Sequence, residues 1–296
     1  PPVFFSAGAV SETEWKVVLE EIAMASAAGV HQYILTLPLP WTGPKQLEEI
    51  LVKVLLVLET DPKARFYLRL NLNPPTAWFQ SHGDDGMRLG DQNSPCPSPA
   101  SEIWREETGK VLAAMVAGMA IAPFHDRILG YVLTGLAEDR WLIPSGFDAS
   151  PANLLGFRKW LRKQYATDAG LQAAWKTANV TLDNAAIPVK PDAADPRHAF
   201  LGLPEMQPVS DFLRYTSTVT AEALGHFAGL VKSVSDSEAA VLAPYGFSYE
   251  LVNNDTGQYA LESLLDGPLD GFMSPISYED RGLGGAGGMM GPVDSA

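Results

Sequence analysis

Carboxylate, amide and aromatic side chains gather just after the strand-like segments of this sequence. Aromatic rings stack on the C–H faces of sugars, and pairs of carboxylates perform the proton transfers and nucleophilic attack of glycoside cleavage. These residue types therefore indicate carbohydrate chemistry. The candidates, grouped by the segment they follow, are Trp41; Asn71, Asn73 and Trp78; Glu138, Asp139, Arg140 and Trp141; Tyr245, Tyr249 and Glu250; and Ser277, Tyr278, Glu279, Asp280 and Arg281.

Glu138 is the strongest single candidate for catalysis. It follows a strand-like segment in the run Leu136–Trp141, where a glutamate has few structural tasks other than pairing with Arg140. The other candidates have structural interpretations that remain open. These are packing for Trp41, Tyr245 and Tyr278, and solvated loop charge for Glu250, Glu279 and Asp280.

Such side chains need a scaffold that brings the ends of several strands together. Strand-like segments alternate with helix-like segments along the chain, and this alternation predicts a parallel sheet with helices outside it. The predicted strands are 3–6, 32–37, 65–72, 128–134, 239–243 and 271–274. The predicted helices between them are 11–29, opened by Ser11 and Glu14 as a capping box, then 45–58, 100–122, 208–233 and 259–265.

The fold class expected from this order is α/β, a (β/α)8 TIM-barrel type. Six strands are visible where a closed barrel needs eight, and open sheet edges are unfavourable. We therefore expect one barrel domain over residues 1–296, incomplete at its C-terminal end, with a helical insertion at 136–208. Residues 76–99 are rich in Pro, Gly and Asp and predict a long loop.

A doubly wound nucleotide-binding fold is the alternative, and it is poorly supported. The turn Ser6–Ala9 does not have the Gly-x-Gly-x-x-Gly pattern that holds a pyrophosphate. The glycine-rich run 282–288 leads to Pro292 and not to a helix, which is typical of a flexible loop. We expect no cofactor.

Composition excludes several other classes. The 296 residues carry a formal charge of −14, and their Lys and Arg are scattered, which argues against nucleic acid as a partner. No apolar run is long enough for a membrane span. Cys96 is the one cysteine, in a predicted loop with nothing to activate its thiol, and the 5 histidines lack ligand spacing, so we expect no metal site. The compartment is not readable from these residues.

Several motifs in order resemble the β-galactosidase-like barrels related to glycoside hydrolase family 42. The resemblance covers nearly the whole chain and is strongest from Ile128 onward. It is carried by Ile128–Trp141; Phe157–Tyr165 with Leu171–Trp175; Tyr245–Leu251; and Ser274–Arg281 with the glycine-rich loop and Pro292–Ser295.

This resemblance implies a retaining hydrolase of β-galactosides or related β-linked oligosaccharides. The acid/base would be the glutamate after the fourth strand, which Glu138 matches best. The asparagine that usually precedes it is Ala137 here, and two residues separate Glu138 from Trp141, so Asp139 remains a competitor. The nucleophile would follow a seventh strand and is not expected in this chain. Residues expected to bind substrate are Trp41, Asn73, Trp78, Tyr245, Tyr278 and Arg281.

Three other functions remain open. A barrel of this kind can bind a sugar without cleaving it. A different hydrolase would use two carboxylates within this chain, such as Glu138 and Glu250. An incomplete barrel can also lack a function of its own. A homo-oligomer is compatible with the resemblance, because trimers are common among such barrels.

Overall fold

The computed structural model describes residues 4–7, 14–90, 92–144, 147–191, 204–246, 256–274 and 282. Its main feature is a six-stranded parallel sheet, curled into a half-barrel, in the order β1-β2-β3-β6-β7-β8. All six segments predicted as strands are strands, within two residues at either end. They are β1 (Phe5–Ala7), β2 (Gln32–Leu37), β3 (Arg65–Asn71), β6 (Ile128–Thr134), β7 (Ala240–Ala243) and β8 (Gly271–Phe272).

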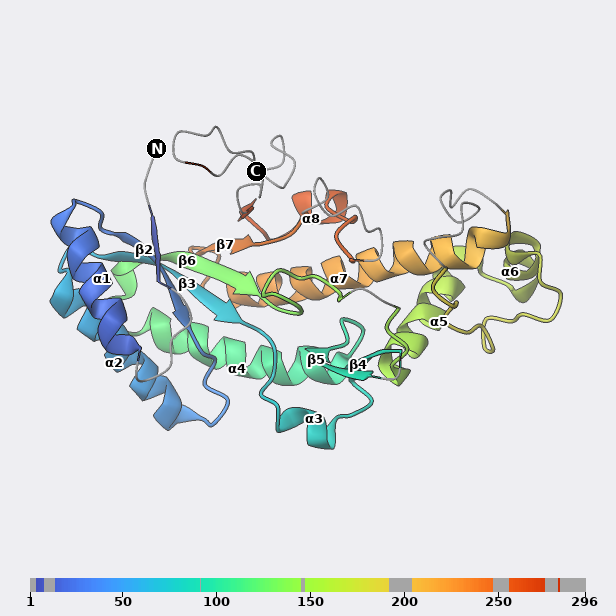
Figure 1. Ribbon diagram of the computed structural model, residues 1–296, viewed down its shortest axis with the longest axis horizontal. Helices are drawn as coiled ribbons and strands as arrows, with labels where there is room; N and C mark the ends of the chain where they lie inside the picture. Colours follow the sequence, from blue (N-terminus) through green and yellow to red (C-terminus); the bar gives the residue numbers. More distant parts are fainter. Residues whose placement is uncertain are drawn as a thin grey trace.

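Helices cover the convex face of this sheet. Each packs against the next in the order α1, α2, α4, α7 and α8, so the helix layer follows the strand order (Figure 1). Ser11 lies outside the described residues, and the first helix is described from Trp15. The bounds are α1 (Trp15–Ala27), α2 (Pro44–Thr60), α4 (Glu102–Ala120), α7 (Gln207–Val234) and α8 (Glu262–Leu265), with short 3₁₀ turns at His125–Arg127 and Pro204–Met206.

Alternation along the strands sends apolar side chains to the helices and polar ones to the concave face. In β3, Phe66, Leu68 and Leu70 are buried in the main hydrophobic core, whereas Arg69 and Asn71 alternate with them and are only half-buried. Successive side chains of a strand point to opposite faces, so this pattern separates a hydrophobic layer from a polar concave surface. Within the described residues, no helix is both long and apolar enough to cross a membrane.

The prediction that residues 76–99 form an unstructured loop was wrong. They contain the short helix α3 (Trp78–Ser81) and an antiparallel hairpin of β4 (Gly86–Leu89) and β5 (Gln92–Pro97). Cys96 accordingly lies in a strand, where it is buried. Proline and glycine disfavour strands on average, but here the hairpin is fixed from outside, because the buried Asp148 accepts a 3.0 Å hydrogen bond from the Arg88 backbone.

The segment between β6 and α7 contains helices α5 (Pro151–Tyr165) and α6 (Asp168–Trp175). The Ser150 hydroxyl caps α5 by accepting a hydrogen bond from the Asn153 backbone N–H. These two helices lie far from the sheet, at the outer end of the 28-residue α7 (Figure 1). They build a second core there around Phe157 and Phe212.

The segments Phe157–Tyr165 and Leu171–Trp175, which carry part of the family resemblance, lie in α5 and α6 and contribute to this second core. Tyr165 and Trp175 both donate hydrogen bonds to the buried Asp211 of α7, at 2.6 and 2.8 Å. A buried carboxylate requires such donors, because an unpaired charge in an apolar setting is strongly unfavourable. The motif therefore attaches the two helices to α7.

A polar cluster at the amino ends of β2 and β3 contributes to stability. Asp61 is buried and accepts hydrogen bonds from His31 at 2.8 Å, Tyr33 at 2.7 Å and the Lys63 backbone at 3.0 Å. Burial alone would raise the pKa of Asp61, but the hydrogen bonds from these groups outweigh it and lower the pKa below its ordinary value of 3.8.

We expect this cluster to give the protein an acid-sensitive stability. Because the folded pKa of Asp61 is lowered, its contribution is present above the unfolded value of 3.8 and is lost as pH falls through the folded value. In urea unfolding, Asp61→Asn should cost about 1–3 kcal/mol at pH 7, and the difference from wild type should shrink below about pH 4. The exposed Asp183→Asn is the control and should change stability little. A difference that stays constant from pH 7 to pH 3 would contradict this role.

Candidate active site at the carboxyl ends of the strands

The concave face holds a small cavity toward the carboxyl ends of the strands, with a volume of about 210 Å³. The sheet register places Arg69 beside Val132, and Asn71 beside Thr134, on one face. This end of a parallel barrel is where such folds carry their active sites. Residues lining the cavity include Ser6, Ile34, Arg69, Thr134, Arg140 and Met273.

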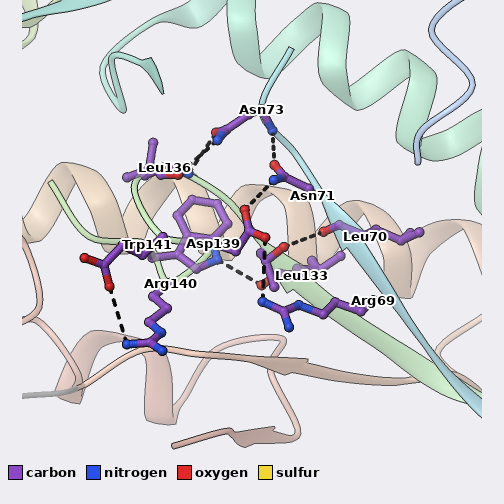
Figure 2. A network of polar contacts seen from close by, with 11 residues as sticks. Arg69, Leu70, Asn71, Asn73, Leu133, Leu136, Asp139, Arg140 and Trp141 are labelled. Carbon is purple, nitrogen blue, oxygen red and sulfur yellow. Dashed lines mark hydrogen bonds and ion pairs between the residues drawn. The ribbon is translucent and has the colours of Figure 1, made fainter. Parts of the chain in front are cut away.

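The loop after β6 is fixed from both sides. The Asn73 side chain makes two hydrogen bonds to the Leu136 backbone, accepting its N–H at 2.8 Å and donating to its carbonyl at 2.9 Å (Figure 2). At the far end of the loop, the buried Trp141 donates its indole N–H to the Leu133 carbonyl at 2.9 Å. Residues 137–140 are thus held as a short tip between two anchors.

This loop has an unusual backbone. Leu136, Glu138, Asp139 and Trp141 all adopt positive φ angles between 56° and 58°. The left-handed region costs a residue with a Cβ about 1–2 kcal/mol. Strain of this kind persists only where surrounding contacts over-determine it, and it concentrates at functional sites. The two anchors supply those contacts here.

Asp139 is held over the end of the sheet. Its Oδ1 accepts a hydrogen bond from the Asn71 amide, and its Oδ2 lies 3.7 Å from Arg69 Nη2 (Figure 2). Both partners come from β3, so the carboxylate bridges the neighbouring strands β3 and β6. Each oxygen of Asp139 therefore has a fixed partner from the concave face.

Glu138 points away from this network. Its side chain is 66% exposed, and it has one long contact, 3.4 Å from Arg140 Nη1. The residue stays at the carboxyl end of β6 and is not buried against Arg140, so its assignment as acid/base remains a prediction. Among the described residues that line the cavity there is no carboxylate, but Asp139 and Glu138 each contact an arginine of the lining.

The other predicted residues are not all brought together. Asn73 lies in the site, but both the oxygen and the nitrogen of its side-chain amide form hydrogen bonds with the Leu136 backbone. Trp41 is half-buried against the main core.

Trp78 is buried, donates to Glu107 at 2.6 Å and stacks on His82. Tyr245 is buried and donates to the Gly257 carbonyl at 2.9 Å, and burial raises its pKa. Outside the described residues lie Tyr249, Glu250, Ser277, Tyr278, Glu279, Asp280 and Arg281.

Sequence reasoning missed two residues of the site. Arg69 was read as part of a strand, although a charge that alternates with Leu68 and Leu70 was a usable signal for the concave face. Gln258 gave no signal. It donates to the backbone carbonyls of Arg140 and Trp141 at 3.0 and 2.8 Å, and it accepts the Gly246 amide at 2.6 Å. Gln258 thereby joins the loop after β6 to the chain after β7.

No metal centre emerges from the part of the chain that the structure describes, where no three His, Cys, Asp or Glu side chains gather with ligand geometry.

Comparison with known proteins supports the fold and no finer assignment. No protein-family model matches the chain, and no curated protein matches its sequence significantly. Among solved structures, the catalytic domain of β-amylase from Paenibacillus polymyxa is 18% identical with a TM-score of 0.71, covering 92% of this chain and 77% of that one. The β-galactosidase from Bacillus circulans sp. alkalophilus is 13% identical with a TM-score of 0.63, covering 95% and 40%.

A β-galactosidase from the psychrophilic Marinomonas ef1 is 16% identical, with a TM-score of 0.57, covering 82% of this chain and 36% of that one. The chain thus spans two fifths or less of the length of these β-galactosidases. At such identities the similarity concerns the fold alone. The chain has a partial (β/α)-barrel fold that resembles those of glycoside hydrolases.

Two substitutions at Glu138 test the loop conformation. Glycine and alanine both remove the carboxylate and its contact with Arg140, but only alanine keeps the Cβ that disfavours positive φ. We expect Glu138→Gly to be more stable than Glu138→Ala by about 1 kcal/mol in urea unfolding. At the exposed Glu106 of α4, the control, the order should reverse, because glycine is the poorer helix former. The same order at both positions would disprove the left-handed geometry at Glu138.

Proposed function

We propose that this protein is a retaining glycoside hydrolase that acts on β-galactosides or related β-linked oligosaccharides. The observation that carries the proposal is the loop 136–141, which holds two adjacent carboxylates in a strained conformation at the carboxyl end of β6. Its position beside a concave cavity is the one expected of a barrel active site. The fold similarity to β-galactosidases supports the same class.

Within this proposal, Glu138 is the acid/base. A general acid has to carry a proton and reach the glycosidic oxygen. Both oxygens of Asp139 already face donors, from Asn71 and Arg69, whereas Glu138 is exposed, longer and held by one 3.4 Å contact. Glu138 would donate its proton to the leaving oxygen and then take a proton from water. Asp139 would stay as a fixed anion that orients the site.

The second carboxylate of a retaining mechanism lies about 5–5.5 Å from the acid/base and attacks the anomeric carbon. The described residues offer no such partner lining the cavity. In the proposed mechanism the nucleophile is the glutamate that the family resemblance places after a seventh strand.

A protein that binds sugar without cleaving it is the second candidate function. It is favoured by one observation, namely that the cavity is lined by guanidinium, hydroxyl and apolar groups and by no carboxylate among the described residues. Such a lining can hold a sugar but cannot cleave it. The two functions differ in turnover, and both predict binding.

Turnover of aryl β-glycosides distinguishes them. We expect a form of the protein that includes the nucleophile of the seventh strand to hydrolyse aryl β-galactosides, and Glu138→Gln in that form to lower kcat/KM by about 10²–10⁴-fold for poor leaving groups. The loss should be smaller for good leaving groups, which need less protonation. Glu106→Gln, on the exposed face of α4, is the control and should leave activity unchanged.

Comparison of Asp139→Asn with Glu138→Gln shows which of the two carboxylates is the acid/base. If it shows the leaving-group dependence and Glu138→Gln does not, the acid/base is Asp139. Sugar binding without any turnover in the form that includes the seventh-strand nucleophile would establish the binding function and refute hydrolysis.

A further inference from the structure

We propose that the concave cavity recognises an anionic substituent on its sugar, a carboxylate or a sulfate ester, through Arg69 and Arg140. This inference rests on the proposed carbohydrate function and names the substrate class of the same site. It does not require that the sugar be cleaved.

The charges that face the cavity are positive. Arg69 and Arg140 both line it, and no carboxylate does so among the described residues. The acids that pair with these arginines, Asp139 and Glu138, lie outside the lining although both are partly exposed. Among the described lining residues, a ligand in the cavity therefore contacts guanidinium groups and no carboxylate.

Neither guanidinium is saturated by its partner. Arg69 lies 3.7 Å from Asp139, and Arg140 lies 3.4 Å from Glu138, through one contact each. Charge-assisted hydrogen bonds are about 2.7–2.9 Å long, and arginine has five N–H donors in a fork that fits carboxylate and sulfate oxygens. The Nε of Arg69 is buried, and it has no hydrogen-bond partner among the described residues. Both groups thus retain donors for a ligand.

The rest of the lining fits a sugar acid better than a bare ion. Ile34, Val132 and Met273 form an apolar wall, and Ser6 and Thr134 provide hydroxyl groups. An apolar wall lowers the local dielectric, which strengthens charge pairing. The volume of about 210 Å³ corresponds to about seven water molecules, enough for one small charged group and part of a ring.

The whole-molecule charge works against such a ligand. A chain with a formal charge of −14 repels anions at long range, so general attraction does not account for anion binding. Any preference for an acidic sugar must come from a local site. Substitution of the two arginines therefore tests directly whether this local site causes the preference.

Calorimetric titration compares D-galacturonate and D-galactose 6-sulfate with neutral D-galactose. We expect at least one of the two acidic sugars to bind about 10-fold or more tightly than galactose, with a preference that weakens as salt is raised. Arg140→Met and Arg69→Met should each reduce the preference to about 3-fold or less, because each weakens binding of the acidic sugar more than binding of galactose. The exposed Arg162→Met, which removes a guanidinium paired with Asp183, is the matched control and should leave the preference intact.

Each outcome is decisive for the proposal. Equal binding of acidic and neutral sugars, a preference that survives both arginine substitutions, or inorganic sulfate bound as tightly as the sugar acids would overturn it. Arg140→Lys, which keeps the charge but not the fork, should retain part of the preference and guards against a folding defect in Arg69→Met. Hydrolysis of aryl galactosides without any acid preference would refute this inference alone. Acid preference without hydrolysis would refute only the proposed catalysis.

Discussion

The pair of hydrogen bonds between the Asn73 side chain and the Leu136 backbone is the contact on which the candidate site depends. It joins the chain after β3 to the loop after β6, two neighbouring strands of the sheet. An asparagine amide offers a donor NH₂ group and an acceptor oxygen, and here both bind the backbone of one residue, Leu136. With Leu136 fixed, the next residues turn through left-handed conformations, and Asp139 reaches Asn71 and Arg69 of β3 (Figure 2).

The long helix α7 contributes buried side chains to both hydrophobic cores. Its C-terminal half, with Phe227 and Val231, packs under the sheet, and its N-terminal half, with Phe212 and Tyr215, packs against α5 and α6. Helices α5 and α6 are thereby attached to the barrel, and they contribute no residue to the lining of the cavity. The loop 136–141 is positioned chiefly by Asn73, Asn71 and Gln258.

Much of the fold could be predicted from sequence, and the reason is physical. Alternation in segments such as 65–72 and helical periodicity in segments such as 208–233 report burial directly, so the strands and outer helices were confirmed. The hairpin β4–β5 was missed, because its Pro- and Gly-rich residues are held by Asp148, 60 residues away in the chain. Local propensity carries no information about such a contact.

The site was predictable only in outline. Residue types at strand ends located Asn73, Glu138 and Asp139, but not the partners that orient them. Arg69 lies within a strand, and Gln258 is more than 100 residues from the loop that it holds. The roles of Trp78 and Tyr245 were not readable either, because an aromatic residue after a strand looks the same whether it faces a ligand or the core.

The most direct test of the account is a crystal structure of the protein with D-galacturonate bound. The account predicts the sugar in the concave cavity, with its carboxylate against Arg69 and Arg140 and its ring beside the loop that carries Glu138 and Asp139. Sugar bound elsewhere, for example in the groove between α4 and α5 that Arg105 and Trp160 line, would contradict it.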